Sequence, residues 1–289
     1  MLQHIKEYTK LLRIKHYIKN FLIFLPIFFG REIFDKSKLC NAILGFVCFC
    51  SISSAVYIFN DYRDIDKDRA HPTKKNRPLA SGRISKKVAI ITIIICLCIA
   101  LIGSMMIGNI NGAICLYLYL VLNILYSLGM KNMPIIDIAI LASGFVIRVF
   151  YGGFITNITI SKWLYLVITT GSLYMGLGKR RNELKRMIAG GERKFETRNV
   201  LKYYNEAFLD KNMYVCMGLT NVFYAMWTIE MPNNKISWTV PAFFIILMYY
   251  SLDIEGDSEG DPIEVIFKDR VLICIVAIYF ICIFYLIYI

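Results

Sequence analysis

The chain has 289 residues, of which 57% are hydrophobic and 19% are charged, and its formal net charge is +12. Soluble globular proteins rarely have so apolar a composition. It therefore excludes a soluble enzyme and predicts a polytopic membrane protein. The positive charge fits membrane topology and attraction to anionic lipids or phosphates, and we expect no nucleic-acid partner.

Apolar segments about 20 residues long, enough to cross a bilayer, recur along the whole chain. They predict an all-α fold of about nine transmembrane helices around a central cavity, with a cytoplasmic cap. The first segment is interrupted by Lys19, Asn20 and Pro26. The predicted spans lie near residues 17–34, 38–60, 88–108, 111–130, 133–156, 161–178, 212–230, 236–252 and 271–289.

The basic residues orient these spans. When the N-terminus is placed inside the cell, most of the 33 Lys and Arg residues fall in cytoplasmic segments, which is the positive-inside pattern. The basic residues on the opposite side are Arg31, Lys36, Lys38, Lys162 and Lys235. We therefore expect one domain over residues 1–289, with the N-terminus and the cap loops 61–87 and 179–211 in the cytoplasm. Within the second loop, residues 192–210 predict a short amphipathic helix at the membrane surface.

The second predicted span ends in the sequence NDYRDIDKD, residues 60–68. On a helix, Asp61, Asp64 and Asp68 would fall within a narrow arc, with Asn60 beside it. Carboxylates crowded in this way repel one another unless a cation lies among them, and such oxygen ligands suit Mg²⁺. We therefore predict that these four residues bind Mg²⁺ and, through it, a diphosphate, with Asp61 and Asp64 as catalytic residues. A solvated and inert helix end is the alternative.

Basic residues follow the acidic motif, in the sequence KKNRPLASGR. Lys74 and Arg77 lie where a metal-bound phosphate would need further positive charge, and arginine offers phosphate a planar fork of N–H groups. Arg77 precedes Pro78 in a short turn and is our main candidate for a substrate-binding residue here. The general positive-inside bias explains Lys86 and Lys87 adequately.

A second polar segment, GKRRNELKR, spans residues 178–186 after the sixth predicted span. On a continuing helix, Lys179, Asn182, Glu183 and Arg186 share one face. This face would bind anionic oxygen directly, and Glu183 would be either a metal ligand or the partner of Lys179. A solvated helix end stabilised by that same pair is the alternative.

The fifth predicted span carries Asp137 and Arg148, which lie roughly 16 Å apart along a helix axis and are too distant to pair. A charge near the bilayer centre is costly, so Arg148 would face a polar, substrate-binding cavity or would be a structural arginine bonded to backbone carbonyls. Lys19 would line the same cavity or extend to the cytoplasm. Tyr126 and Lys131, at the cytoplasmic end of the fourth span, are further substrate-binding candidates.

These motifs resemble a known family. NDYRDIDKDR followed by RPLASG is similar to the first signature of the UbiA-type intramembrane prenyltransferase superfamily, and the resemblance extends from RIKHYIKN to the last span. Quinone-forming members carry a second aspartate pair where this chain reads GKRRNEL. That basic form, with RIKHYIKN and GDPIEVIFKDR, looks like the branch called decaprenyl-phosphate phosphoribosyltransferase.

The resemblance implies a Mg²⁺-dependent transferase of a bacterial-type inner membrane. It would join a polyprenyl phosphate to phosphoribosyl pyrophosphate (PRPP), release pyrophosphate and feed cell-wall sugar synthesis. Because PRPP also has a 5-phosphate, a second basic site is needed, for which Lys179, Arg180 and Arg186 are the candidates. An aromatic prenyltransferase of quinone or haem synthesis, using a prenyl diphosphate, is the alternative enzyme. A transporter is the alternative from another class, although transporter sites usually lie at the membrane midplane.

Overall fold

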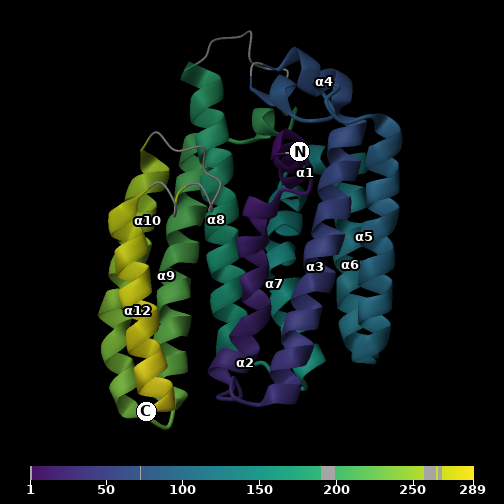
Figure 1. Ribbon diagram of the computed structural model, residues 1–289. Coiled ribbons are helices and arrows are strands. Elements are labelled where there is room, and N and C mark those ends of the chain that lie inside the picture. The colour runs from purple at the N-terminus through teal and green to yellow at the C-terminus, as the bar shows by residue number, and fades with distance from the viewer. Residues whose placement is uncertain (1, 72, 190–198, 257–264, 266–268) are drawn as a thin grey trace. The chain divides into compact units, whose positions relative to one another are not determined.

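The computed structural model describes residues 2–71, 73–189, 199–256, 265 and 269–289. Every regular element in these ranges is a helix (Figure 1). The chain divides into two compact units: unit 1 is formed by residues 1–128 and 147–159, and unit 2 by residues 129–146 and 160–289. The amphipathic helix expected over 192–210 and the GDPIEVIFKDR motif lie partly outside the described residues. The single domain expected from the sequence stays a prediction.

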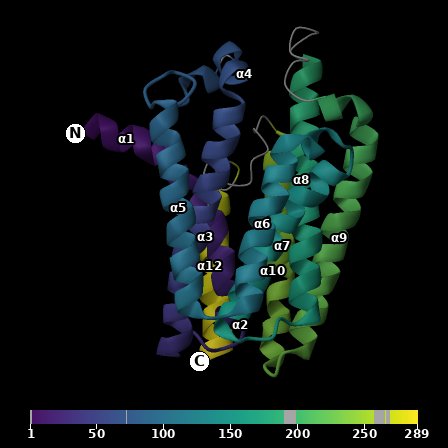
Figure 2. The ribbon, with the colours of Figure 1, turned by 90° about the vertical axis from the view of Figure 1, so that its right-hand side faces the viewer.

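Unit 1 begins with short helical segments and continues with long helices (Figure 2). Asp35 caps the first long helix by accepting hydrogen bonds from the backbone N–H groups of Ser37 and Lys38 at 2.9 and 3.0 Å. The elements are α1 (Leu2–Leu11), the 3₁₀ helix η1 (Ile14–Phe24), α2 (Leu25–Phe29), α3 (Lys36–Arg63), α4 (Ile65–Ala70), η2 (Lys74–Asn76), α5 (Lys86–Ile107), α6 (Ile110–Leu128) and the C-terminal half of α7 (Ile136–Thr156).

Two apolar clusters hold unit 1 together. The larger lies among α3, α5, α6 and α7 and includes Phe49, whose ring contacts the rings of Tyr119 and Tyr151 in tilted geometry. The smaller lies beneath the acidic motif, and its buried members are Leu11, Ile58, Ile65, Leu79, Ile84 and Ala89. Because these residues come from α1, α3, α4, α5 and the loop after η2, their burial fixes the loop against the end of α3.

Glycines allow close packing of helices inside unit 1. A Cβ atom at Gly152 of α7 would collide with the backbone carbonyl of Ile23 in η1. A Cβ at Gly45 of α3 would collide with the side chain of Ile155. Small residues are typical of helix interfaces in membranes, where they let backbones approach each other.

Unit 2 is built on α8, which packs along α9. Its core gathers buried side chains from α8, α9 and α10, among them Tyr174, Leu177, Leu209, Met213 and Ile254. The elements are η3 (Met130–Asn132), the N-terminal half of α7, α8 (Lys162–Ala189), η5 (Asn199–Tyr203), α9 (Glu206–Glu230), η6 (Asn234–Thr239), α10 (Val240–Glu255) and α12 (Arg270–Tyr288).

Six helical segments of the described chain are long and apolar enough to cross a membrane, and they confirm six of the nine expected spans. These are α3, α5, α6, α7, α12 and the continuous segment formed by η6 and α10. The other three expected spans stay predictions. Two of them coincide with α8 and α9, which are 28 and 25 residues long but carry more polar residues. The span expected at 17–34 is not one long α-helix, because η1 is a 3₁₀ helix and α2 ends at Phe29.

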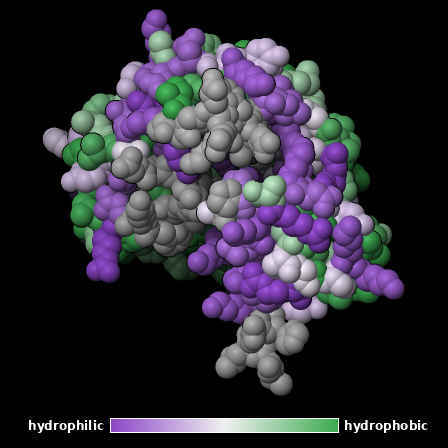
Figure 3. Space-filling view, turned by 90° about the horizontal axis from the view of Figure 1, so that it is seen from above, coloured by the Kyte–Doolittle hydropathy of each residue, from purple (hydrophilic) through white to green (hydrophobic). Residues whose placement is uncertain are grey.

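The surface of the long helices agrees with a lipid environment. On α5, apolar side chains such as Ile91, Ile94, Ile102 and Met105 are exposed. Around α4, hydrophilic side chains instead cover much of the surface that is drawn in colour (Figure 3). This is the distribution that a membrane span with a basic loop at one end requires. The cytoplasmic cap itself stays a prediction.

Candidate functional site

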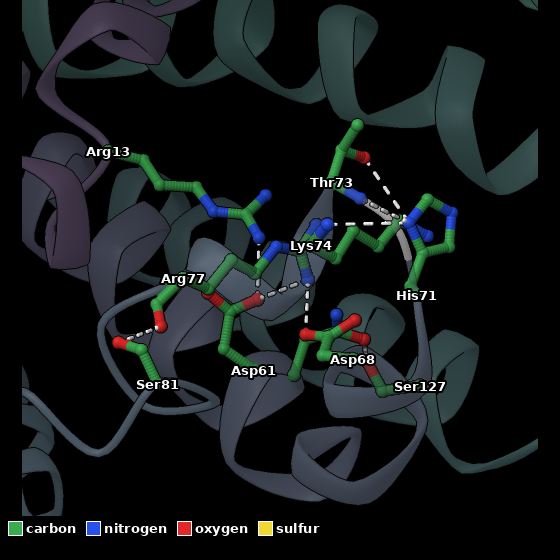
Figure 4. Close-up of polar contacts among 10 residues, drawn as sticks. Arg13, Asp61, Asp68, His71, Thr73, Lys74, Arg77, Ser81 and Ser127 are labelled. Atoms are coloured by element: carbon green, nitrogen blue, oxygen red, sulfur yellow. Dashed lines mark hydrogen bonds and ion pairs between the residues drawn. The ribbon is translucent and has the colours of Figure 1, made fainter.

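In unit 1, two buried carboxylates of the acidic motif both contact one arginine side chain (Figure 4). Asp61, in the last turn of α3, and Asp68, in α4, are only 3% and 4% exposed. Nη1 of Arg77 donates to Oδ1 of Asp61 at 3.0 Å and to Oδ2 of Asp68 at 2.7 Å. The two carboxylates therefore converge on a single positively charged group.

A break between α3 and α4 creates this convergence. Asp64 is the residue at the break, with φ −95° and ψ 14°. The motif is therefore not one continuous helix, which was the basis for predicting that Asp61, Asp64 and Asp68 lie within a narrow arc. The N–H of Asp64 still donates to the carbonyl of Asn60 at 3.0 Å, and the N–H of Asp68 donates to the carbonyl of Asp64 at 2.8 Å. Buried Ile65 anchors α4 to the apolar cluster below, which turns Asp68 towards Asp61.

Arg13 is a member of the cluster that the sequence analysis did not identify. Its Nη2 atom donates to Oδ1 of Asp61 at 2.5 Å, and its guanidinium lies 4.7 Å from the centre of the Tyr57 ring. Arg13 has φ 54° and ψ 47°, a left-handed conformation that is uncommon outside glycine and recurs at functional sites. The RIKHYIKN motif begins at Arg13, but nothing in the sequence shows this backbone conformation or the contact with a residue 48 positions away.

Asn60 joins the end of α3 to the end of α6. Its Oδ1 atom accepts a hydrogen bond from Oγ of Ser127 at 3.2 Å, and Arg63 donates to the carbonyl of Ser127 at 2.5 Å. Tyr126 precedes Ser127 and is half-buried. These contacts fix the last turn of α3, from which Asp61 projects.

A cavity of about 280 Å³ opens beside the carboxylates. Three of its lining residues are cationic and only one is acidic, so its charge suits an anion. Lys74 lies beside it on η2, where the backbone N–H groups of Thr73 and Lys74 both donate to Nδ1 of His71. The cavity is lined by Lys10, Arg13, Asp61, Thr73, Asn76, Arg77 and Pro78.

The donor set fits a magnesium diphosphate. Among the described residues, no group of three or more His, Cys, Asp or Glu side chains could hold a metal without other ligands. Mg²⁺, however, commonly takes one or two carboxylates and completes its coordination with water and substrate phosphate. Asp61 and Asp68 already meet at a common cation, and the adjacent cavity is basic.

The segment GKRRNELKR forms the end of α8 in unit 2, where Arg180 is completely buried. Its Nε atom donates to Oδ2 of Asp137 at 2.5 Å, and its Nη1 atom donates to Oε2 of Glu183 at 2.8 Å. Asn182 is buried too, Lys179 and Glu183 are half-buried, and Arg186 is exposed. Arg180 therefore contributes to an internal ion-pair network, a different environment from the phosphate contact expected of it.

Tyr204 completes this network. Its hydroxyl donates to Oδ1 of Asp137 at 2.6 Å and accepts a hydrogen bond from the N–H of Ile135, also at 2.6 Å. Burial, and then the hydrogen bond to Asp137, raise the pKa of Tyr204 to about 12, so its hydroxyl keeps its proton at neutral pH. Ile135 has φ 68°, an unusual value for a β-branched residue, and the bond to Tyr204 holds this turn in place. Lys131, in η3, also belongs to unit 2.

Arg148 lies in the core of unit 1 and is 4% exposed. It donates to Oδ1 of Asn20 at 2.7 Å and to the hydroxyl of Tyr119 at 3.2 Å. Its guanidinium lies 4.8 Å from the ring centres of both Phe49 and Tyr119, which is cation–π geometry. These contacts fasten η1 to α6 and α7. They account for the buried charge, while half-buried Lys19 lies next to Asn20 on η1.

Comparisons with known proteins agree with these observations. The model of the UbiA prenyltransferase family matches residues 24–180. Decaprenyl-phosphate phosphoribosyltransferase of Mycobacterium tuberculosis H37Rv is 30% identical over 91% of this chain and 88% of its own. Decaprenyl-phosphate phosphoribosyltransferase of Mycolicibacterium smegmatis is 32% identical over 91% of this chain and 86% of its own.

A solved structure shares the fold. The UbiA homolog from Archaeoglobus fulgidus bound to GPP and Mg²⁺ superposes with a TM-score of 0.73 at 19% identity, covering 98% of this chain and all of that one. The family match, the relatives that align with nine-tenths of the chain and the six apolar helices agree with one another. The chain belongs to the UbiA prenyltransferase family and is a multi-pass membrane transferase.

Proposed function

We propose that this protein transfers the 5-phosphoribosyl group of PRPP to a polyprenyl phosphate and releases pyrophosphate, with Mg²⁺ as cofactor. The observation that carries the proposal is the pair of buried carboxylates, Asp61 and Asp68, that meet Arg77 beside a basic cavity. The names of the mycobacterial relatives, which align with nine-tenths of the chain, support this choice of substrates. We place the enzyme in a bacterial-type inner membrane, with its N-terminus and cap loops in the cytoplasm.

The proposed reaction exchanges one bond at C1 of ribose for another. The bond from C1 to the pyrophosphate oxygen breaks, and that oxygen keeps the electron pair. An oxygen of the polyprenyl phosphate forms the new bond to C1, which passes through an oxocarbenium-like state. The attacking phosphate is already anionic, so no strong general base is required.

The residues of unit 1 would bind and orient the leaving group. Asp61 and Asp68, with Asn60 and Asp64 as further ligands, would hold Mg²⁺, and the metal would supply positive charge to the diphosphate. Arg77 would donate hydrogen bonds to the diphosphate oxygens and so stabilise the leaving group electrostatically. Lys74 would add positive charge at the edge of this site. The roles of Lys19, Tyr126, Lys131 and Arg148 in substrate binding stay predictions.

For the 5-phosphate we propose Lys179 and Arg186 of α8. Arg186 is exposed and Lys179 is half-buried, whereas the guanidinium of Arg180 is committed to Asp137 and Glu183. Arg180 would therefore act by holding Glu183 and the end of α8 in position. This refines the earlier expectation that all three basic residues bind phosphate directly.

An aromatic prenyltransferase using a prenyl diphosphate is the second candidate. The structural neighbour bound to GPP and Mg²⁺ supports it, because a prenyl diphosphate would use the same carboxylates and arginines. The basic GKRRNEL segment counts against it, since quinone-forming members of the superfamily carry a second aspartate pair at the matching place.

The experiment that tests the proposal is pyrophosphate release by the purified protein in detergent. PRPP, a polyprenyl phosphate and Mg²⁺ are supplied together and then omitted one at a time. Release that requires all three is the expected result. Activity with a prenyl diphosphate and an aromatic acid, but none with PRPP, would refute the first proposal in favour of the second.

A further inference from the structure

Two arginines form hydrogen bonds with the carboxylates that would bind the proposed metal. Oδ1 of Asp61 accepts hydrogen bonds from both Arg13 and Arg77, and Oδ2 of Asp68 accepts one from Arg77 (Figure 4). The arginines come from different elements, since Arg13 lies between α1 and η1 and Arg77 follows η2. Two buried negative charges are thus balanced by two positive charges that lie directly on them.

This balance opposes the binding of a metal ion alone. Buried carboxylates need compensation, and here the guanidiniums supply it. A divalent cation that enters by itself must displace these donors and would add positive charge beside Arg13, Arg77 and Lys10. A metal diphosphate is net anionic, so it would instead restore the balance of charge.

The arginines are also equipped to bind the diphosphate. Arginine has five N–H donors. Within the described chain, the guanidinium of Arg77 donates to other residues only through Nη1, and that of Arg13 only through Nη2. Both line the cavity beside the carboxylates, so their remaining N–H groups lie near any anion that enters it. The left-handed backbone of Arg13 and its contact with the Tyr57 ring hold the guanidinium at this position.

We propose that Arg13 and Arg77 are substrate-binding residues that couple metal binding to diphosphate binding. Without a diphosphate they lie on Asp61 and Asp68 and weaken the affinity for divalent metal. When a diphosphate-bearing substrate enters, they turn to its phosphate oxygens and leave the carboxylates to the metal. This inference rests on the proposed function only in requiring a diphosphate substrate.

The test is Mn²⁺ binding to the full-length protein in detergent, followed by electron paramagnetic resonance, with and without pyrophosphate. Free Mn²⁺ is held constant by correcting for the soluble manganese pyrophosphate complex. In the wild type, pyrophosphate is expected to raise the affinity for Mn²⁺ by about tenfold or more, which is a typical coupling between sites. Equal affinity with and without pyrophosphate would overturn the proposal, and this measurement needs no variant.

Variants then assign the coupling to the arginines. Arg13→Gln and Arg77→Gln should bind Mn²⁺ alone about tenfold more tightly than the wild type, because a competing charged hydrogen bond is gone. Both should lose most of the gain from pyrophosphate, and Arg13→Lys should keep part of it. Lys67→Gln, which removes an equal charge from an exposed position on α4, should behave like the wild type. Weaker Mn²⁺ binding in Arg13→Gln would refute its role.

The outcomes separate this inference from the proposed function. Coupling between Mn²⁺ and pyrophosphate that depends on Arg13 and Arg77, without turnover of PRPP, would retain the role of the arginines and reject the phosphoribosyl substrate. Turnover of PRPP without coupling would do the reverse.

Discussion

Arg180→Met tests whether Arg180 stabilises the fold or binds substrate. Arg180 and Asp137 are both fully buried, so no water screens their ion pair, and loss of the arginine leaves a buried carboxylate without its cation. Breaking a buried pair in this way costs about 3–5 kcal/mol. For a unit of this size, we expect the thermal unfolding midpoint in detergent to fall by roughly 10 °C.

A second substitution checks the cause of that loss. Asp137→Asn removes the charge but keeps the oxygen that accepts the hydrogen bond from Tyr204. Combined with Arg180→Met, it should recover about half or more of the lost stability, because the pair is removed together. Arg186→Met, on the exposed side of α8, should leave the midpoint unchanged and raise KM for PRPP. An Arg180→Met protein with the wild-type midpoint and a raised KM would refute the structural role.

Two further predictions concern packing and polar contacts. Tyr204→Phe should destabilise the protein by about 1–3 kcal/mol in denaturant unfolding, because Ile135 and Asp137 each lose a hydrogen-bond partner. Because the pKa of Tyr204 is raised to about 12, the stability that its hydroxyl contributes is present below pH 10 and is lost as the pH rises through 12. The stability of Tyr204→Phe should not show this fall between pH 10 and pH 12. Gly152→Ala should lower the unfolding midpoint, because the added Cβ meets the backbone of Ile23; an unchanged midpoint would contradict that contact.

The sequence identified several residues that the structure brings together in unit 1, although their roles stay predictions and the carboxylate paired with Asp61 is Asp68, not Asp64. The acidic motif at the end of an apolar run located Asp61 and Asp68, and the turn before Pro78 located Arg77. These residues are close along the chain, so the pattern selects them, but it does not predict the break at Asp64 that brings Asp68 to the side of Asp61. Arg13 was not predictable, because its contact depends on a left-handed residue between two helical segments and on the path of η1 along α3.

The orientation of α8 shows a different limit of sequence patterns. Helical spacing predicts that Lys179, Asn182, Glu183 and Arg186 share one side of a helix, but it does not show which side packs against a neighbour. The structure buries Asn182 and leaves Arg186 exposed. The structure buries Arg180 because Asp137 and Tyr204 provide a charged partner and a hydrogen-bond network for it. Those partners lie on α7 and after η5, too far along the chain for spacing to connect them.

The central claim is that Asp68, which is buried and paired with Arg77, helps to bind the metal diphosphate. The most direct measurement is pyrophosphate release from PRPP and a polyprenyl phosphate by Asp68→Asn beside Asp66→Asn. Both variants lose one negative charge from α4, but the side chain of Asp66 is 94% exposed, whereas that of Asp68 is 6% exposed. We expect Asp68→Asn to lose about a hundredfold or more in turnover and Asp66→Asn to keep wild-type turnover. Equal turnover by a folded Asp68→Asn protein would contradict the account.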